Sequence, residues 1–226
     1  MIKPSSRAFS FIFCLAIPVM SVSAASLDAE LVDATGQALG NAVLTLGGAG
    51  GPAAASGIMD QRSLQFAPTV LAVRSGTAVH FPNSDNVRHQ VYSFSPTKRF
   101  ELRLYQGTPS EPVLFDKPGL VVLGCNIHDW MLGYIYVTDD PWFAVSDDSG
   151  KLKIDNLPAG TYQATLWHPQ LANMLPVSAG QLVVPEKGLQ QRFTLQLSGS
   201  AAALPSTPKP SAFGEAFKKA TRDVQQ

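Results

Sequence analysis

The chain has 226 residues, of which 45% are hydrophobic and 15% charged, with 17 basic and 17 acidic side chains. This is enough apolar material for one large or two small packed domains, so the chain is not disordered overall. The 18 glycines and 17 prolines follow no fixed period, which excludes collagen and coiled coil and favours a turn-rich β protein.

The N-terminus has the pattern of a secretory signal peptide. Two basic residues precede an almost wholly apolar run at residues 8–20, and small residues follow it, which predicts cleavage after Ala24 or Ala25. The run has about 13 residues, short of the roughly 20 that span a bilayer. We therefore expect residues 1–24 to be removed and the mature protein to be periplasmic, with no retained membrane anchor.

Cleavage changes the charge and the cysteine count. It removes two basic residues and Cys14, which leaves a net charge of −2 and a single cysteine, Cys125. No basic face remains, which argues against nucleic acid as a partner. An exported chain with one cysteine forms no internal disulfide, and a free thiol is a liability there unless something occupies it. The alternative is an inert, buried cysteine.

The first part of the mature chain, residues 25–55, is expected to hold N-terminal strands and a linker. Apolar alternation predicts two strands within 27–46, separated by a turn at 33–40. Residues 47–57 are rich in Gly and Ala, which is typical of a loop.

Residues 56–138 form the next expected domain, and strand and turn patterns fill it. No ten-residue stretch of this region has a helical apolar stripe, so the architecture is predicted to be all-β. The continuous apolar run at 120–123 indicates a strand buried on both faces. The strands expected in this domain are 63–66, 69–73, 78–81, 90–94, 114–115, 120–123 and 134–137.

Residues 139–198 repeat this character and predict a second small β-sandwich. A polar turn at 146–150 precedes strands that alternate apolar and polar residues. The strands expected here are 151–157, 161–168, 181–184 and 191–197.

The last segment, residues 199–226, is expected to be a Ser/Ala/Pro-rich linker followed by a short C-terminal helix. Phe213, Phe217, Ala220 and Val224 would form one narrow apolar stripe on that helix. Such a helix either frays or docks on its own domain, or it binds a partner.

Cys125, His128 and Met131 lie three residues apart on one loop between apolar strands. Because the strands fix the ends of the loop, its side chains can fold around one point. Soft sulfur donors together with imidazole select copper, and one cysteine, two histidines and a long axial methionine make a blue-copper electron-transfer site. His89, on a polar turn 36 residues before the cysteine, is the candidate for the second histidine.

The other two histidines are not expected to bind metal. His80 alternates with Phe81 on a strand, so it faces outward when Phe81 faces inward. His168 follows Trp167 at a strand end, where a surface role is expected.

Two motifs together resemble the cupredoxins, the family of plastocyanin, azurin and amicyanin. They are the N-x-D-x-x-x-H hairpin at 83–89 and the C-x-x-H-x-x-M loop at 125–131. More closely, the mature chain resembles secreted bacterial proteins labelled methylamine utilisation proteins, which carry a plastocyanin-like domain. The resemblance implies a cupredoxin Greek-key β-sandwich over 56–138. It also implies copper as the cofactor, with four ligands: His89, Cys125, His128 and Met131.

A second resemblance concerns the rest of the chain. Residues 31–46 and 148–162 look like the two halves of a carboxypeptidase regulatory-like, transthyretin-type sandwich. We therefore hypothesise one sandwich split by the insertion of the cupredoxin domain. Modules of this kind are structural, so no catalysis is expected there.

The sequence thus predicts a mononuclear copper protein, not an enzyme, that passes single electrons between transient redox protein partners. One alternative is a copper-trafficking protein with the same ligands, and another is a structural or interaction module with a cupredoxin fold. A copper enzyme with an open ligand position is a weaker third. The sequence shows no phosphate loop, nucleophile elbow or paired carboxylates that would indicate a hydrolase.

Overall fold

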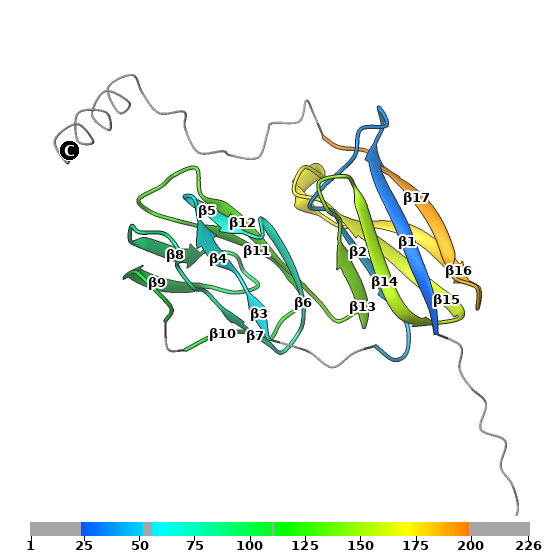
Figure 1. The fold of residues 1–226 in the computed structure, drawn as a ribbon, viewed down its shortest axis with the longest axis horizontal. Helices are drawn as coiled ribbons and strands as arrows, with labels where there is room; N and C mark the ends of the chain where they lie inside the picture. Colours follow the sequence, from blue (N-terminus) through cyan, green and yellow to red (C-terminus); the bar gives the residue numbers. More distant parts are fainter. Residues whose placement is uncertain (1–23, 52–55, 110, 199–226) are drawn as a thin grey trace, which may run out of the picture.

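The computed structural model describes residues 24–51, 56–109 and 111–198 (Figure 1). Over these ranges every helix or strand is a β-strand except one short 3-10 turn, η1 (Ala172–Met174), so the predicted all-β fold is confirmed. In the described part of the chain, no helix has the length and hydropathy that crossing a bilayer requires. The predicted C-terminal helix, and the predicted signal peptide up to residue 23, lie outside the described residues.

The middle of the chain folds into the first β-sandwich. A five-stranded sheet with the order β6-β12-β11-β8-β9 and a three-stranded sheet with the order β10-β7-β3 share one buried apolar core, and β4 and β5 form a hairpin beside them. The strands are β3 (Gly57–Ile58), β4 (Asp60–Arg62), β5 (Gln65–Ala67), β6 (Val70–Arg74), β7 (Thr77–His80), β8 (His89–Ser93), β9 (Phe100–Tyr105), β10 (Val113–Phe115), β11 (Gly119–Gly124) and β12 (Leu132–Thr138).

The strand predicted at 63–66 begins too early, because only its second half belongs to β5. Ser63 and Leu64 form the turn of the β4–β5 hairpin, with φ angles of 53° and 59°. Apolar alternation does not reveal this turn, because neither residue is the Gly, Asn or Asp that usually adopts a left-handed conformation. The strand β9 is also not predicted, since it lies at the sheet edge and its Leu104 is exposed.

The second sandwich is assembled from both ends of the described chain. Strand β1 pairs with β14 and β17, and β2 pairs with β13 and β15, so residues 27–46 contact 145–197 as the split-sandwich hypothesis requires. The two sheets, β14-β1-β17 and β13-β2-β15-β16, enclose an apolar core. The strands are β1 (Ala24–Asp33), β2 (Val43–Gly47), β13 (Trp142–Val145), β14 (Lys151–Pro158), β15 (Gly160–Trp167), β16 (Val177–Val184) and β17 (Leu189–Leu195).

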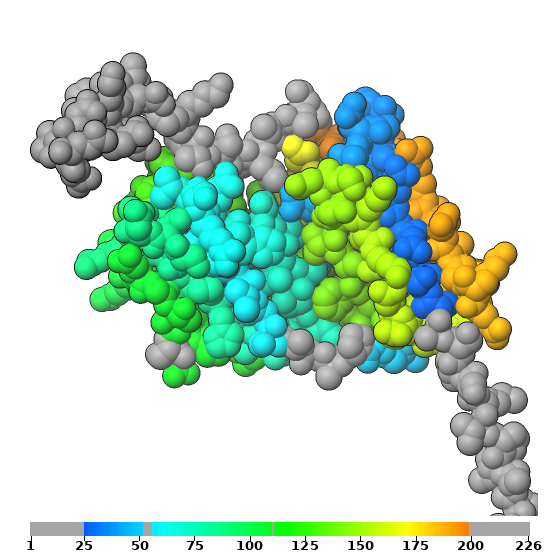
Figure 2. Space-filling model, viewed as in Figure 1, coloured from blue at the N-terminus to red at the C-terminus, as the bar shows by residue number. Residues whose placement is uncertain are grey.

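The two sandwiches meet through an aromatic cluster. Trp167 of β15 packs on Tyr134 and Tyr136 of β12, with ring centroids 5.8 and 5.4 Å apart. Leu120 and Val122 of β11 also pack against this cluster, whereas the alternate residues of β11 face the first core. Both faces of β11 are therefore covered, as its apolar run predicts. Figure 2 shows the first sandwich lying directly against the strands β13 and β14.

Candidate metal centre

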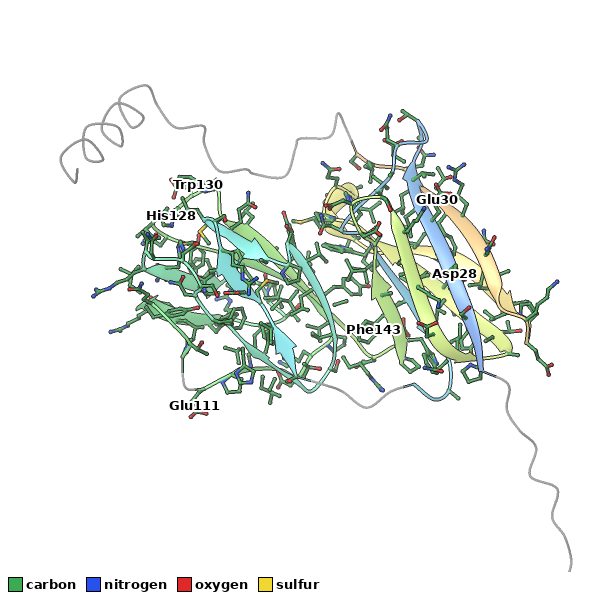
Figure 3. All side chains as sticks on the ribbon, in the orientation of Figure 1. Asp28, Glu30, Glu111, His128, Trp130 and Phe143 are labelled. Carbon is green, nitrogen blue, oxygen red and sulfur yellow. The ribbon has the colours of Figure 1, made fainter. Side chains whose placement is uncertain are left out.

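The predicted donor residues converge at one end of the first sandwich. His89 is the first residue of β8, Cys125 follows β11, and Met131 precedes β12. His128 lies between them on the loop, and Figure 3 shows it beside Trp130 at this end of the domain. The expectation that His89 sits in the turn before a strand is thus slightly off, because the strand already begins at His89.

Three donor atoms surround one point. The Nδ1 atoms of His89 and His128 are 3.1 Å apart, and the Cys125 Sγ lies 4.0 Å from the first and 3.7 Å from the second. Metal bonds of about 2.0 Å to nitrogen and about 2.3 Å to sulfur, about 120° apart, would place donors about 3.5 to 3.7 Å from one another. The observed separations therefore fit a single metal ion between the three atoms.

The donors differ in how much water reaches them. His89 and Cys125 are 0% and 2% exposed, whereas His128 is only partly buried. Met131 is 1% exposed and belongs to the same core cluster as Cys125, and its backbone N–H donates to the carbonyl of His128 at 2.9 Å. The backbone thus brings Met131 to the same loop end, and its thioether bond to a metal stays a prediction.

Asp85 fixes the orientation of His89. Its Oδ2 lies 2.8 Å from the His89 Nε2. A carboxylate can only accept this hydrogen bond, so Nε2 carries the proton and the Nδ1 lone pair points towards His128 and Cys125. Burial alone would raise the pKa of Asp85, but hydrogen bonds from Leu64, His89 and Ser63 outweigh it and hold that pKa below its usual value. The carboxylate therefore stays charged near neutral pH.

Asn83 shapes the loop that carries Asp85. Its Nδ2 donates to the carbonyls of Val87 and Tyr105, each at 2.9 Å, and its Oδ1 accepts the backbone N–H of Asp85 at 3.0 Å. Each polar position of the N-x-D-x-x-x-H motif thus has a defined contact. The sequence reveals the motif, and the structure shows what its Asn and Asp do.

His128 is held between two aromatic rings. Its ring centroid is 4.8 Å from that of His89 and 5.3 Å from that of Trp130. Burial lowers the pKa of His128, nearby His89 lowers it further, and Asp85 opposes this only in part. The neutral imidazole that metal binding requires is therefore favoured near neutral pH.

The sequence does not predict a hydrogen-bonded pair that lies beside the centre, the buried Gln61 and the half-buried Tyr105. The Gln61 Nε2 donates to the Tyr105 hydroxyl at 2.5 Å, and this hydroxyl donates to the carbonyl of Phe81 at 2.7 Å. Burial, with Asp60 and Cys125 nearby, raises the pKa of Tyr105 to about 12 against the effect of the Gln61 hydrogen bond. Tyr105 is thus a neutral hydrogen-bonding group at physiological pH.

The remaining histidines lie outside the donor cluster. In the described ranges, His89, Cys125 and His128 are the one group of three or more His, Cys, Asp or Glu side chains that could share a metal ion. The surface role predicted for His168 is wrong, because this residue is 4% exposed and its Nε2 lies 3.2 Å from the carbonyl of Gly40. The turn that follows β1 covers it, a contact across 128 residues that a local pattern does not reveal.

Comparisons with known proteins do not assign the chain to a family. No family model matches the sequence, and no curated protein matches it. Among solved structures, the chain is similar to a copper-containing nitrite reductase from Thermus scotoductus, with 26% identity and a TM-score of 0.35, over 40% of this chain and 24% of that one. It therefore spans about a quarter of the nitrite reductase chain.

Smaller solved proteins are similar over a comparable part of the chain. A purple cupredoxin from Nitrosopumilus maritimus is 20% identical, with a TM-score of 0.33, over 37% of this chain and 100% of that one. Amicyanin from Paracoccus versutus is 18% identical, with a TM-score of 0.32, over 38% of this chain and 84% of that one. The structures that the chain resembles in part thus include cupredoxins.

Proposed function

We propose that this protein is an exported, periplasmic, mononuclear copper protein that carries single electrons between transient redox partners. One observation carries the proposal: two histidine Nδ1 atoms and one cysteine sulfur lie 3.1 to 4.0 Å from one another. One thiolate and two imidazoles are the donors that select copper in electron-transfer sites. Met131 would be the weak axial ligand.

When bound, copper would supply a single electron by alternating between Cu(I) and Cu(II). The residues of the chain would keep the donor positions the same in both states. Cys125 and His89 are buried in packed surroundings, and the Asp85 carboxylate holds the ring of His89. A preorganised donor set suits electron transfer, since little has to move when the charge changes.

His128 is the donor through which a partner would approach. It is the most exposed of the three donors, and the side chain of the preceding Ile127 is 47% exposed. Trp130 and Leu132, which follow His128 in the chain, are half-buried and would belong to the same apolar docking patch. A small apolar surface of this kind suits weak, short-lived complexes. We further propose that the second sandwich has a structural role, since its described core holds no donor cluster.

Spectroscopy of the copper-loaded mature chain tests the proposal. Residues 25–226 are loaded with Cu(II), and the visible and electron-paramagnetic spectra are recorded with a voltammogram. We expect an intense colour with a reversible one-electron response, and both are lost in Cys125→Ser. His168→Gln is the matched control, because it changes a buried histidine outside the donor cluster and keeps the colour. A colourless protein, or one that binds only Cu(I), contradicts the proposal.

A further inference from the structure

The two-residue turn between β4 and β5, next to the metal centre, has positive φ angles, as many hairpin turns do, but at residues that are not Gly, Asn or Asp. Ser63 and Leu64 have φ angles of 53° and 59°, in the left-handed region. This region is sterically disfavoured for a residue other than glycine, and it is rare for a bulky side chain. Such a conformation persists where surrounding contacts hold it, and residues in such conformations cluster at functional sites. The partners of this turn therefore indicate its purpose.

One side of the turn is bound to the support of His89. The backbone N–H of Ser63 donates to the Asp85 Oδ1 at 2.7 Å, and that of Leu64 donates to the Asp85 Oδ2 at 2.9 Å. The same Oδ2 accepts the His89 Nε2 at 2.8 Å. Two consecutive N–H groups can reach one carboxylate here because both residues are left-handed. The Asp85 carboxylate thus accepts two backbone N–H groups from the turn and one N–H from the donor histidine.

The other side of the turn is bound to the loop of His128. The Leu64 carbonyl accepts the Trp130 Nε1 at 3.3 Å, and the ring of Trp130 packs on that of His128. The Leu64 side chain itself packs against the core cluster that holds Cys125 and Met131. Leu64 therefore contacts groups beside both donor histidines through its N–H and its carbonyl, and its side chain packs against the core that includes Cys125 and Met131.

We propose that the Ser63–Leu64 turn is a positioning element for the metal centre. It holds Asp85 against His89 and Trp130 against His128, so that both Nδ1 atoms face the Cys125 sulfur before a metal arrives. The inference rests on the proposed function only in naming copper as the bound ion. A purely structural turn would join β4 to β5 and leave the donors where they are when its contacts are lost.

Two substitutions of Leu64 separate these roles. Leu64→Pro removes the N–H that Asp85 accepts, and a proline φ near −65° is incompatible with 59°. It also disfavours the left-handed conformation of Ser63, because a residue before proline is restricted to extended conformations. Leu64→Gly keeps both backbone groups and adopts a positive φ without strain. Both variants lose the leucine side chain, so their difference reports on the turn conformation.

The first readout needs no metal. Histidine ¹⁵N NMR of the metal-free full chain reports which ring nitrogen carries the proton. We expect a single His89 tautomer, protonated at Nε2, in the wild type and in Leu64→Gly, and a mixture of tautomers in Leu64→Pro. The second readout is Cu(II) affinity, measured by competition with a chelator. Loss of a residue that orients a ligand costs 10- to 100-fold in metal affinity, and we expect this loss in Leu64→Pro alone.

Each outcome decides the inference. If Leu64→Pro keeps the tautomer and the affinity, or if Leu64→Gly loses both, the turn does not position the donors. Should Leu64→Pro fail to fold, Trp130→Phe keeps an aromatic ring beside His128 and removes the indole N–H to Leu64, and an affinity unchanged from the wild type then overturns the inference. A wild-type protein that binds no Cu(II) contradicts the proposed function, whereas the tautomer measurement still tests the turn.

Discussion

The two sandwiches bury polar groups for different purposes. In the first sandwich, the buried polar side chains at the end that carries the donor cluster are Asp60, Gln61, Asn83 and His89. In the second, the buried polar side chains Ser146 and His168 bond to the carbonyls of Leu39 and Gly40 and so hold the segment after β1. Burying a polar group is costly unless it is hydrogen-bonded. Buried polar side chains therefore support a donor site in the first sandwich and hold a loop in the second.

The two fully buried histidines show what distinguishes these purposes. His168 Nδ1 accepts the backbone N–H of Gln170 at 3.2 Å while Nε2 faces a carbonyl, so both nitrogens of the neutral ring are satisfied. His89 is satisfied at Nε2 by Asp85, but its Nδ1 faces another Nδ1 and a thiol. A ring nitrogen whose lone pair converges on other donor atoms, while the other nitrogen donates its N–H to a carboxylate, is the feature of a metal site. Burial without it identifies only a packed histidine.

The largest expected effect tests whether the two regions are energetically separate. Trp167→Ala removes the ring that joins the sandwiches through Tyr134 and Tyr136. We expect a loss of about 3 to 5 kcal/mol in the free energy of unfolding, as for other buried tryptophans. Calorimetry should then show two transitions where the wild type has one, because the shared cluster no longer couples the domains.

Trp142→Ala is the matched control for this experiment. Trp142 is also buried, but it packs within the second core. Its loss should lower the temperature of a single transition without splitting it. A Trp167→Ala protein that still unfolds in one step would show that other contacts couple the two sandwiches.

A pair of leucines sharpens the comparison. Leu44 and Leu123 are both 0% exposed, one in each core. Truncation of either to alanine should cost about 2 to 5 kcal/mol of unfolding free energy. Only Leu123→Ala should also accelerate the reaction of the Cys125 thiol with a thiol reagent in the metal-free protein, since Leu123 lies two residues before the cysteine in the same core. Equal acceleration in both variants would mean that the donor end is not a separately packed region.

Local patterns predict the donor site because its chemistry is local. The C-x-x-H-x-x-M loop and the hairpin of His89 are each readable within a few residues, and the structure brings Cys125, His89 and His128 together. The split of the second sandwich is also readable. Asp33 and Asp147 head turns of the same pattern, and each carboxylate accepts hydrogen bonds from the residues two and four positions later.

What the sequence does not predict depends on contacts between distant segments. The left-handed Leu64 is held by Asp85, 21 residues away, and by Trp130, 66 residues away. The burial of His168 depends on a turn 128 residues earlier. No periodicity within β4, β5 or β15 encodes these partners. Tertiary contacts therefore decide the support of the site, whereas the ligand types are decided locally.

The smallest expected effect concerns the pH dependence of stability and separates the two buried histidines. Burial lowers the pKa of His168 below its ordinary value of 6.5, and the hydrogen bond to Gly40 opposes this only in part. Because the unfolded chain then binds the proton more tightly than the folded chain, His168 stabilises the fold above about pH 6.5. This stabilisation is lost as the pH falls through the lowered pKa of the folded state.

Denaturant unfolding of metal-free wild type and His168→Gln at pH 7.5 and pH 5 measures this term. The wild type should lose more unfolding free energy than the variant over this interval, by on the order of 1 kcal/mol. All other ionisable groups are the same in the two proteins, so their contributions cancel in the difference. An equal loss in the two proteins would show that protonation of His168 is not linked to folding. We expect a difference because a protonated Nδ1 cannot accept the backbone N–H of Gln170, so the charged ring loses this hydrogen bond in the folded state.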